Sequence, residues 1–197
     1  YANRMHSYKD LPIRIGEIAH DFRFEASGTL KGIERGRHFC QNDAHLFVTP
    51  EQIKDEFSKV VDLIFDVYKD FGITDYRCVL SLRDPEDTEK YHQDDEMWNN
   101  AENALREVMN DLGIEYTEEI GEAAFYGPKL DIQFKNVHGK EDTIITVQID
   151  FALGERLNMT YIDENGREME AAADRVILAL GMQADADTAE QFRGIAR

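Results

Sequence analysis

The sequence predicts an α+β fold in which helices flank a mostly antiparallel sheet. Two long segments repeat apolar residues every three or four positions, which is the period of an amphipathic helix, and several short segments alternate apolar with polar residues, which is the period of a strand. Hydrophobic residues make up 42% of the 197 residues, which is enough to form a core. No repeat, low-complexity tract or Pro/Gly-rich linker divides the chain.

Two helices have clear sequence boundaries. The first has Thr49 as its N-cap, Pro50 as its first residue and Gln52 as the capping-box partner, and Gly72 ends it. The second is predicted over residues 95–112. The first helix presents one apolar face, which consists of Ile53, Phe57, Val60, Val61, Ile64, Tyr68 and Phe71.

The strands are short and lie before, between and after the helices. Period-two alternation is clearest at residues 130–134, and Asp163-Glu164-Asn165-Gly166 is a turn signal. The predicted strands are 18–25, 35–48, 77–82, 130–134, 143–151, 157–162 and 167–169, with a further apolar segment at 176–180.

Charge and cysteine content limit the function classes. The chain carries 40 acidic and 22 basic residues, and a net charge of −18 argues against nucleic-acid binding by overall charge. Its two cysteines, Cys40 and Cys78, form no disulfide framework, which favours a cytoplasmic protein. No segment reaches the roughly 20 apolar residues of a membrane helix. Because the chain lacks an initiator Met and a signal-peptide pattern, we expect a piece of a longer protein.

A first group of candidate binding residues surrounds the loop between the first two predicted strands. Arg23 and Glu25 would share one strand face, because side chains alternate along a strand. Arg35 adds a second guanidinium, and Phe39 offers a flat surface for a base. These groups suit a nucleoside triphosphate, since a guanidinium binds phosphate bidentately and a carboxylate accepts from an amino group. An ordinary cross-strand ion pair between Arg23 and Glu25 is the alternative.

A second group follows on the next strand. Gln41, Asp43 and His45 share one face, whereas Cys40 points to the other. They suit a small polar substrate pocket in which His45 ligates a metal, and the alternative is a hydrogen-bonded, half-buried histidine.

Two later segments are also candidates. The Gly127-Pro128 turn could present Tyr126 and Lys129 to a ligand, or it could be purely structural with a solvent-facing lysine. Gln148 lies on the polar face of a strand, which could instead face water.

These motifs closely resemble those of threonyl-tRNA synthetases, which are class II aminoacyl-tRNA synthetases. The runs Leu-Pro-Ile-Arg, Phe-Arg-Phe-Glu-Ala-Ser-Gly and Arg-Gly-Arg-His-Phe-Cys-Gln-Asn-Asp-Ala-His are similar to motif 2 of that family. Phe-Tyr-Gly-Pro-Lys at 125–129 and Thr-Val-Gln-Ile-Asp-Phe at 146–151 resemble its downstream motifs. The similarity extends over about residues 1–170. It implies a class II synthetase-like fold and the activation of threonine with ATP, followed by transfer to tRNA(Thr).

The resemblance also implies roles for the ATP-binding residues. Arg23 would bind the α-phosphate and offset the charge that develops on it. Glu25 would recognise the adenine amino group, Phe39 would stack on the ring and Arg35 would hold the phosphate tail. Magnesium would bridge the phosphates. Arg23 is in this way expected to be catalytic as well as nucleotide-binding.

The remaining roles concern threonine. Gln41, Tyr126, Lys129 and Gln148 would line the amino-acid and adenylate pocket, with Gln41 and Lys129 expected to take part in catalysis. Asp43 would hydrogen-bond the threonine hydroxyl. His45 would ligate zinc, which in this family binds the amino and hydroxyl groups of threonine.

The sequence departs from the family near its end. The family's zinc site uses one cysteine, expected upstream of Tyr1, and two histidines, and Asp174 stands in place of the second histidine. Gln183 stands where the family has an ATP-binding arginine. We therefore interpret residues 1–197 as a class II catalytic domain, incomplete at its N-terminal side and divergent after about 170. We expect weak or no zinc binding and impaired adenylation.

Three hypotheses about function follow. The first is the catalytic core of a threonyl-tRNA synthetase, whose longer protein forms a homodimer. The second is a non-catalytic synthetase-like module that binds nucleotide or amino acid. The third is an interaction domain that retains the motifs as scaffold. Binding of ATP and threonine separates them: both bind in the first, one in the second and neither in the third.

Overall fold

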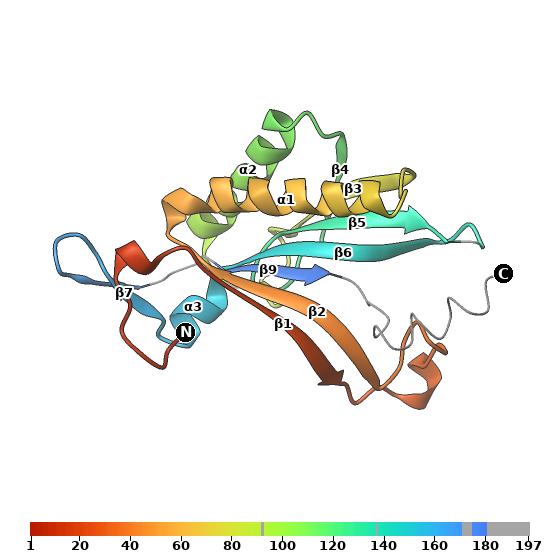
Figure 1. Cartoon of the computed structure of the whole chain (residues 1–197), viewed down its shortest axis with the longest axis horizontal. Helices are drawn as coiled ribbons and strands as arrows, with labels where there is room; N and C mark the ends of the chain where they lie inside the picture. The colour runs from red at the N-terminus through yellow and green to blue at the C-terminus, as the bar shows by residue number, and fades with distance from the viewer. Residues whose placement is uncertain (92, 137, 171–174, 181–197) are drawn as a thin grey trace.

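The computed structural model describes residues 1–91, 93–136, 138–170 and 175–180, and it has the predicted α+β architecture (Figure 1). Seven strands form one sheet, with the order β1-β2-β9-β6-β5-β3-β4. Neighbouring strands are antiparallel except for β3 and β4. The strands are β1 (Ile13–Phe22), β2 (His38–Phe47), β3 (Tyr76–Leu82), β4 (Tyr116–Ile120), β5 (Lys129–Lys135), β6 (Glu141–Asp150) and β9 (Arg175–Leu180).

Two long helices, α1 (Ile53–Asp70) and α2 (Asp95–Asp111), cover one face of the sheet (Figure 1). The predicted capping box is confirmed, because the Thr49 amide donates to Gln52 Oε1 at 3.0 Å ahead of α1. The helices and the sheet enclose one large core, which includes Phe57, Val61, Ile64, Trp98, Leu105, Leu46, Leu80, Leu130, Ile132 and Val147. None of the helices in the described part of the chain is long and apolar enough to cross a membrane.

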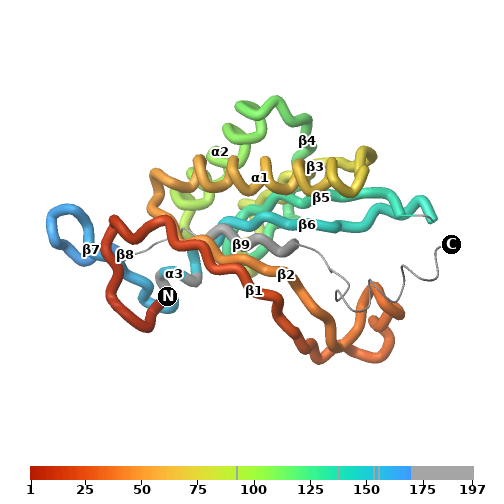
Figure 2. The backbone as a smooth tube through the Cα atoms, viewed as in Figure 1, coloured from red at the N-terminus to blue at the C-terminus, as the bar shows by residue number. Residues whose placement is uncertain are grey.

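A small second sheet lies beside the N-terminal segment (Figure 2). It consists of β7 (Thr160–Ile162) and β8 (Glu168–Glu170), and it follows the short helix α3 (Ala152–Arg156). The Ile162 amide donates to the His6 carbonyl at 2.8 Å, and Tyr1 Oη donates to the Thr160 carbonyl at 3.0 Å. These bonds fix the start of the chain against its later part.

Several predicted boundaries were wrong. β1 spans 13–22 instead of 18–25, and β2 begins at His38 instead of 35. The strand predicted over 157–162 is confined to β7, because Asn158 has a φ of 48°, which ends extended backbone. β4 and α3 were not predicted. The apolar segment 176–180 is β9, which lies between β2 and β6.

A buried carboxylate joins β1 to α1. Glu56 is 3% exposed and accepts from Arg14 Nε at 2.6 Å, from Arg14 Nη2 at 2.7 Å and from Lys59 Nζ at 2.7 Å. The hydrogen bonds from Arg14 lower the pKa of Glu56; its burial opposes that shift, and Lys59 adds to it. Because β1 pairs with β2 along its whole length, this contact also orients β2.

Replacing this carboxylate should cost stability in a pH-dependent way. We expect Glu56→Gln to lower the free energy of unfolding at pH 7 by about 1–3 kcal/mol, because charge-assisted hydrogen bonds are lost. The folded-state pKa lies below the ordinary value of 4.5, so this stability is present above that value and is lost as the pH falls through the folded pKa. Urea unfolding between pH 7 and pH 3 measures the difference.

A matched control is Glu107→Gln, which changes a 64% exposed side chain that pairs with Lys54 at 3.3 Å. It should change the free energy of unfolding by less than about 1 kcal/mol at pH 7. A Glu56→Gln effect that is equal at pH 7 and pH 3 would contradict the assigned ionic contact.

Candidate functional site

The candidate site begins on β2, whose side chains alternate between two environments. Leu46 is 3% exposed and belongs to the core beneath the helices. Phe39, Gln41, Asp43 and His45 have the opposite parity and therefore lie on the face away from α1 and α2. The prediction that Gln41, Asp43 and His45 share a face is confirmed by this strand.

Arg23 and Glu25 lie beyond the end of β1, so their predicted placement within a strand was wrong. The Arg23 amide donates to the Arg37 carbonyl at 2.9 Å, and the Glu25 amide then donates to the Arg23 carbonyl at 2.9 Å. This second bond turns the backbone out of the ladder. Arg23 nevertheless reaches β2, because its Cζ lies 4.9 Å from the centroid of the Phe39 ring.

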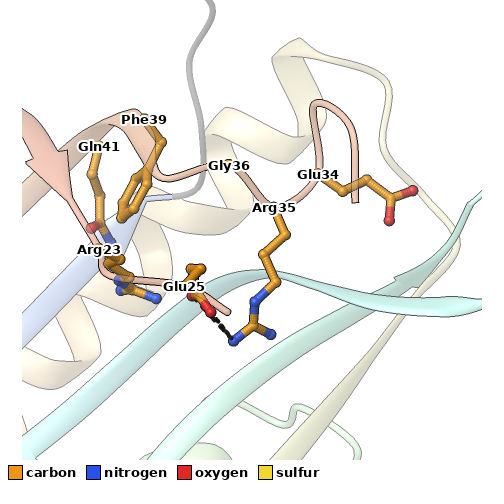
Figure 3. Close-up of a pocket in the computed structure, with 7 residues that line it drawn as sticks. All are labelled: Arg23, Glu25, Glu34, Arg35, Gly36, Phe39 and Gln41. Carbon is orange, nitrogen blue, oxygen red and sulfur yellow. Dashed lines mark hydrogen bonds and ion pairs between the residues drawn. The ribbon is translucent and has the colours of Figure 1, made fainter. Parts of the chain in front are cut away.

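One cavity collects the residues of the first predicted group (Figure 3). Arg35 Nη2 lies 3.3 Å from Glu25 Oε1, and Thr29 Oγ1 donates to Glu25 Oε2 at 3.1 Å. The hydrogen bond from Arg35 lowers the pKa of Glu25, so this carboxylate is an anion at neutral pH. The ion pair therefore joins Glu25 to Arg35 across the loop. The cavity is lined by Arg23, Glu25, Glu34, Arg35, Gly36, Phe39 and Gln41, with Glu34 pointing away from the others.

The second part of the site is the turn before β5. The Phe151 amide donates to the Tyr126 carbonyl at 3.3 Å, and the Ile149 amide donates to the Pro128 carbonyl at 3.1 Å, so the turn is attached to β6. Tyr126 Oη donates to Gln148 Oε1 on β6. Lys129, the first residue of β5, is paired with Gln148. The turn therefore does present Tyr126 and Lys129 beside Gln148.

Strand register places both parts on one face of the sheet. In the ladder, His45 of β2 and Gln148 of β6 are both partners of Ile177 in β9. Directly opposed residues in a sheet point to the same face, so His45, Gln148 and Lys129 all lie on the face away from the helices. His45 and Asp43 lie farther along β2 than the residues that line the cavity.

Asp43, one of the predicted substrate contacts, is partly buried. Burial raises its pKa, whereas His45 and the Ala44 amide, which donates to Asp43 Oδ1 at 3.0 Å, lower it. In the residues that the structure describes, no three His, Cys, Asp or Glu side chains are grouped so as to hold a metal ion. Asp174 and Gln183 lie outside the described residues.

A residue without an assigned role in the sequence analysis is central to the second part. Asp131 of β5 is 5% exposed, and its carboxylate binds Lys129 Nζ at 2.8 Å. Ser81 Oγ and Thr146 Oγ1 each donate to it at 2.7 Å. The sequence did contain one indication of this role, because Asp131 follows Lys129 by two positions and therefore lies on the same face of the strand.

A model of the tRNA synthetase class II core domain (G, H, P, S and T) matches residues 1–181. The chain belongs to this class II synthetase core family. It is 58% identical to threonine–tRNA ligase of Staphylococcus aureus (strain JH9) over 166 aligned residues. The aligned segment makes up 84% of this chain and 26% of that protein. The chain thus spans about a quarter of the length of the curated relatives that it matches.

Solved structures give the same result for this class II core. A threonyl-tRNA synthetase structure from Cryptosporidium parvum Iowa II, described as its RNA binding domain, has a TM-score of 0.79 at 35% identity, covering 89% of this chain and 42% of that one. Putative threonyl-tRNA synthetase ThrRS-1 from Aeropyrum pernix has a TM-score of 0.74 at 29% identity. The match covers 93% of this chain and 43% of that one. The resemblance to threonyl-tRNA synthetases, and with it the fold class, is therefore confirmed.

The turn that carries Tyr126 and Lys129 depends on a close backbone approach. A Cβ added at Gly127 would lie 1.7 Å from the Ile149 carbonyl oxygen. We expect Gly127→Ala to displace the turn from β6 and to lower the free energy of unfolding by about 1–3 kcal/mol, because backbone must move. Gly28→Ala is the matched control, since its Cβ would meet nothing within 4 Å. Denaturant unfolding of both variants measures the difference, and equal stabilities would refute the close approach.

Proposed function

We propose that this chain is the catalytic core of a threonyl-tRNA synthetase, which activates threonine with ATP and transfers it to tRNA(Thr). The observation that carries the proposal is the convergence of Arg23, Glu25, Arg35 and Phe39 on one cavity. Two guanidinium groups for phosphates, one acceptor for an amino group and one aromatic ring match the parts of ATP. The relatives' names supply the choice of threonine.

When ATP binds, its contacts with these residues would replace the contacts that the residues make with one another. Arg35 pairs with Glu25, and Arg23 lies over the Phe39 ring. A phosphate tail would attract both arginines, which leaves Glu25 to accept from the adenine amino group and Phe39 to stack on the ring. Magnesium would be held chiefly by phosphate oxygens and water, as is usual for this ion.

Threonine would bind farther along the same sheet face. Gln41 lines the cavity and precedes Asp43 on the same face of β2, so it connects the nucleotide residues with the substrate residues. Asp43 would accept from the threonine hydroxyl. A valine in its place would leave that carboxylate unmatched, which gives strong discrimination. Tyr126, Gln148 and Lys129 would contact the amino acid and the adenylate from β5 and β6.

Activation would follow from positioning and charge. A carboxylate oxygen of threonine attacks the α-phosphorus, and the bond to pyrophosphate breaks on the opposite side. Arg23 would stabilise the charge on the α-phosphate oxygens, and Lys129 and Gln41 would hold the reacting groups in place.

Zinc does not fit the residues at hand. Of the three ligands that the family's site needs, His45 is the one present in the part of the chain that the structure describes, and no step of the proposed reaction passes through zinc. We expect this chain to retain much less than one zinc per molecule after dialysis, because one imidazole cannot satisfy a four-coordinate site. Elemental analysis by plasma mass spectrometry checks this. One tightly held zinc per chain would contradict it.

The remaining partners are proposed from the similarity to threonine–tRNA ligases. We propose tRNA(Thr) as the second substrate, a homodimer as the working assembly and the cytoplasm as the compartment. Support for the dimer comes from the outer strand β1, where Ile18 and Phe22 are 71% and 77% exposed. Such side chains on a strand at the edge of the described sheet suit coverage by another protein surface.

Calorimetric titration with ATP and with threonine tests the proposal, and both should bind. Arg23→Ala should weaken ATP about tenfold to a hundredfold, because one charge-assisted phosphate contact is worth roughly 1.5–3 kcal/mol. Arg106→Ala is the matched control, since it removes the same charge on α2, where Arg106 pairs with Glu118 at 2.7 Å. Binding of neither ligand, or equal effects of both substitutions, would exclude the proposed site.

A further inference from the structure

Asp131 is a buried carboxylate that the proposed reaction does not touch. It lies on β5 beneath the second part of the site and is 5% exposed. One oxygen, Oδ2, lies 2.8 Å from Lys129 Nζ and accepts from Ser81 Oγ at 2.7 Å. The other, Oδ1, accepts from Thr146 Oγ1 at 2.7 Å. Both carboxylate oxygens are therefore bound by groups from three neighbouring strands.

This arrangement fixes the orientation of the carboxylate. A carboxylate has no donor of its own, so each of its partners must donate. Ser81 on β3 and Thr146 on β6 hold it from opposite sides within the sheet, since β5 lies between these strands. The two hydroxyl groups, which belong to strands of the sheet, fix the carboxylate and so determine where the ammonium group of Lys129 binds.

Lys129 is also available to a ligand. Its side chain is 23% exposed, and an ammonium group has three donors. Lys129 is the ladder partner of Gln148, whose Oε1 accepts from Tyr126 Oη, so Lys129 and Gln148 lie on the same face of the sheet, with Tyr126 bonded to Gln148. A lysine on a flexible stem loses much of its freedom when it binds. An anchored lysine has already lost it.

We propose that Asp131 is a positioning residue that holds the Lys129 ammonium group where negative charge develops during adenylate formation. The proposal rests on the proposed function. Asp131 does not line the nucleotide cavity, and because it is 5% exposed its carboxylate oxygens are not accessible to a substrate. Its effect is therefore exerted through Lys129, with Ser81 and Thr146 as supports.

The test measures threonine-dependent ATP–pyrophosphate exchange in the natural full-length protein. Asp131→Asn keeps the shape but places an amide donor near the ammonium group. We expect kcat to fall about tenfold to a hundredfold, while KM for ATP stays within about twofold. Ser81→Ala should cause a smaller loss, since the charge remains. Asp142→Asn is the matched control, because Asp142 is a carboxylate on β6 that pairs with Lys140 at 3.6 Å, and it should leave kcat unchanged.

A double-mutant cycle separates positioning from a general structural role. In a Lys129→Met background, Asp131→Asn should change kcat by less than about twofold, because the group through which it acts is gone. Equal losses in both backgrounds, or an unchanged kcat in Asp131→Asn, would overturn the proposal.

Binding of a non-hydrolysable threonyl-adenylate analogue gives a second readout that needs no turnover. Asp131→Asn should weaken the analogue in the natural background and not in the Lys129→Met background. A wild-type protein that neither exchanges pyrophosphate nor binds the analogue would refute the proposed function as well. A wild-type protein that does both, combined with an unaffected Asp131→Asn variant, would refute the positioning role alone.

Discussion

The whole candidate site depends on one constraint, the two-residue period of side chains in a single continuous sheet. β9 lies between β2 and β6, and its Ile177 is the ladder partner of both His45 and Gln148. A slip of one residue in either ladder would place one of these side chains on the helix side. The buried core of α1, α2 and the sheet resists such a slip, because every apolar residue of the moved strand would change faces.

The sequence predicted the contents of the site better than its shape. Alternation along residues 39–45 correctly placed Gln41, Asp43 and His45 together, because a strand's period does not depend on its partners. The exact ends of β1 were not predictable in this way, since Arg23 and Glu25 leave the ladder through a local turn. Their convergence with Phe39 and Arg35 arises from side-chain contacts across the loop, which periodicity does not describe.

Asp131 and β4 show a different limit. Asp131 resembles any polar residue of a half-buried strand, and its burial follows only when Ser81 and Thr146 are brought beside it by β3 and β6. β4 contains two adjacent glutamates, and its pairing with β3 is parallel and therefore requires the intervening α2. Tertiary pairing supplies the missing information in both cases, whereas the helices were found because their own period and caps define them.

Charge pairing in the molecule takes two forms, and the difference fits the proposed chemistry. Glu56 and Asp131 are 3% and 5% exposed. Glu56 holds Arg14 with two hydrogen bonds, and Asp131, which Ser81 and Thr146 fix in place, holds Lys129 at 2.8 Å, so these pairs fix structure. Arg35 is 56% exposed and holds Glu25 through a longer contact of 3.3 Å. Glu25 itself is 13% exposed, so this pair differs from the other two chiefly in its longer contact, which phosphate can replace more easily. In the proposed function, a chain with a net charge of −18 would bind the polyanion ATP because ATP would displace Glu25 from Arg35, whereas Lys129 would stay bound to Asp131.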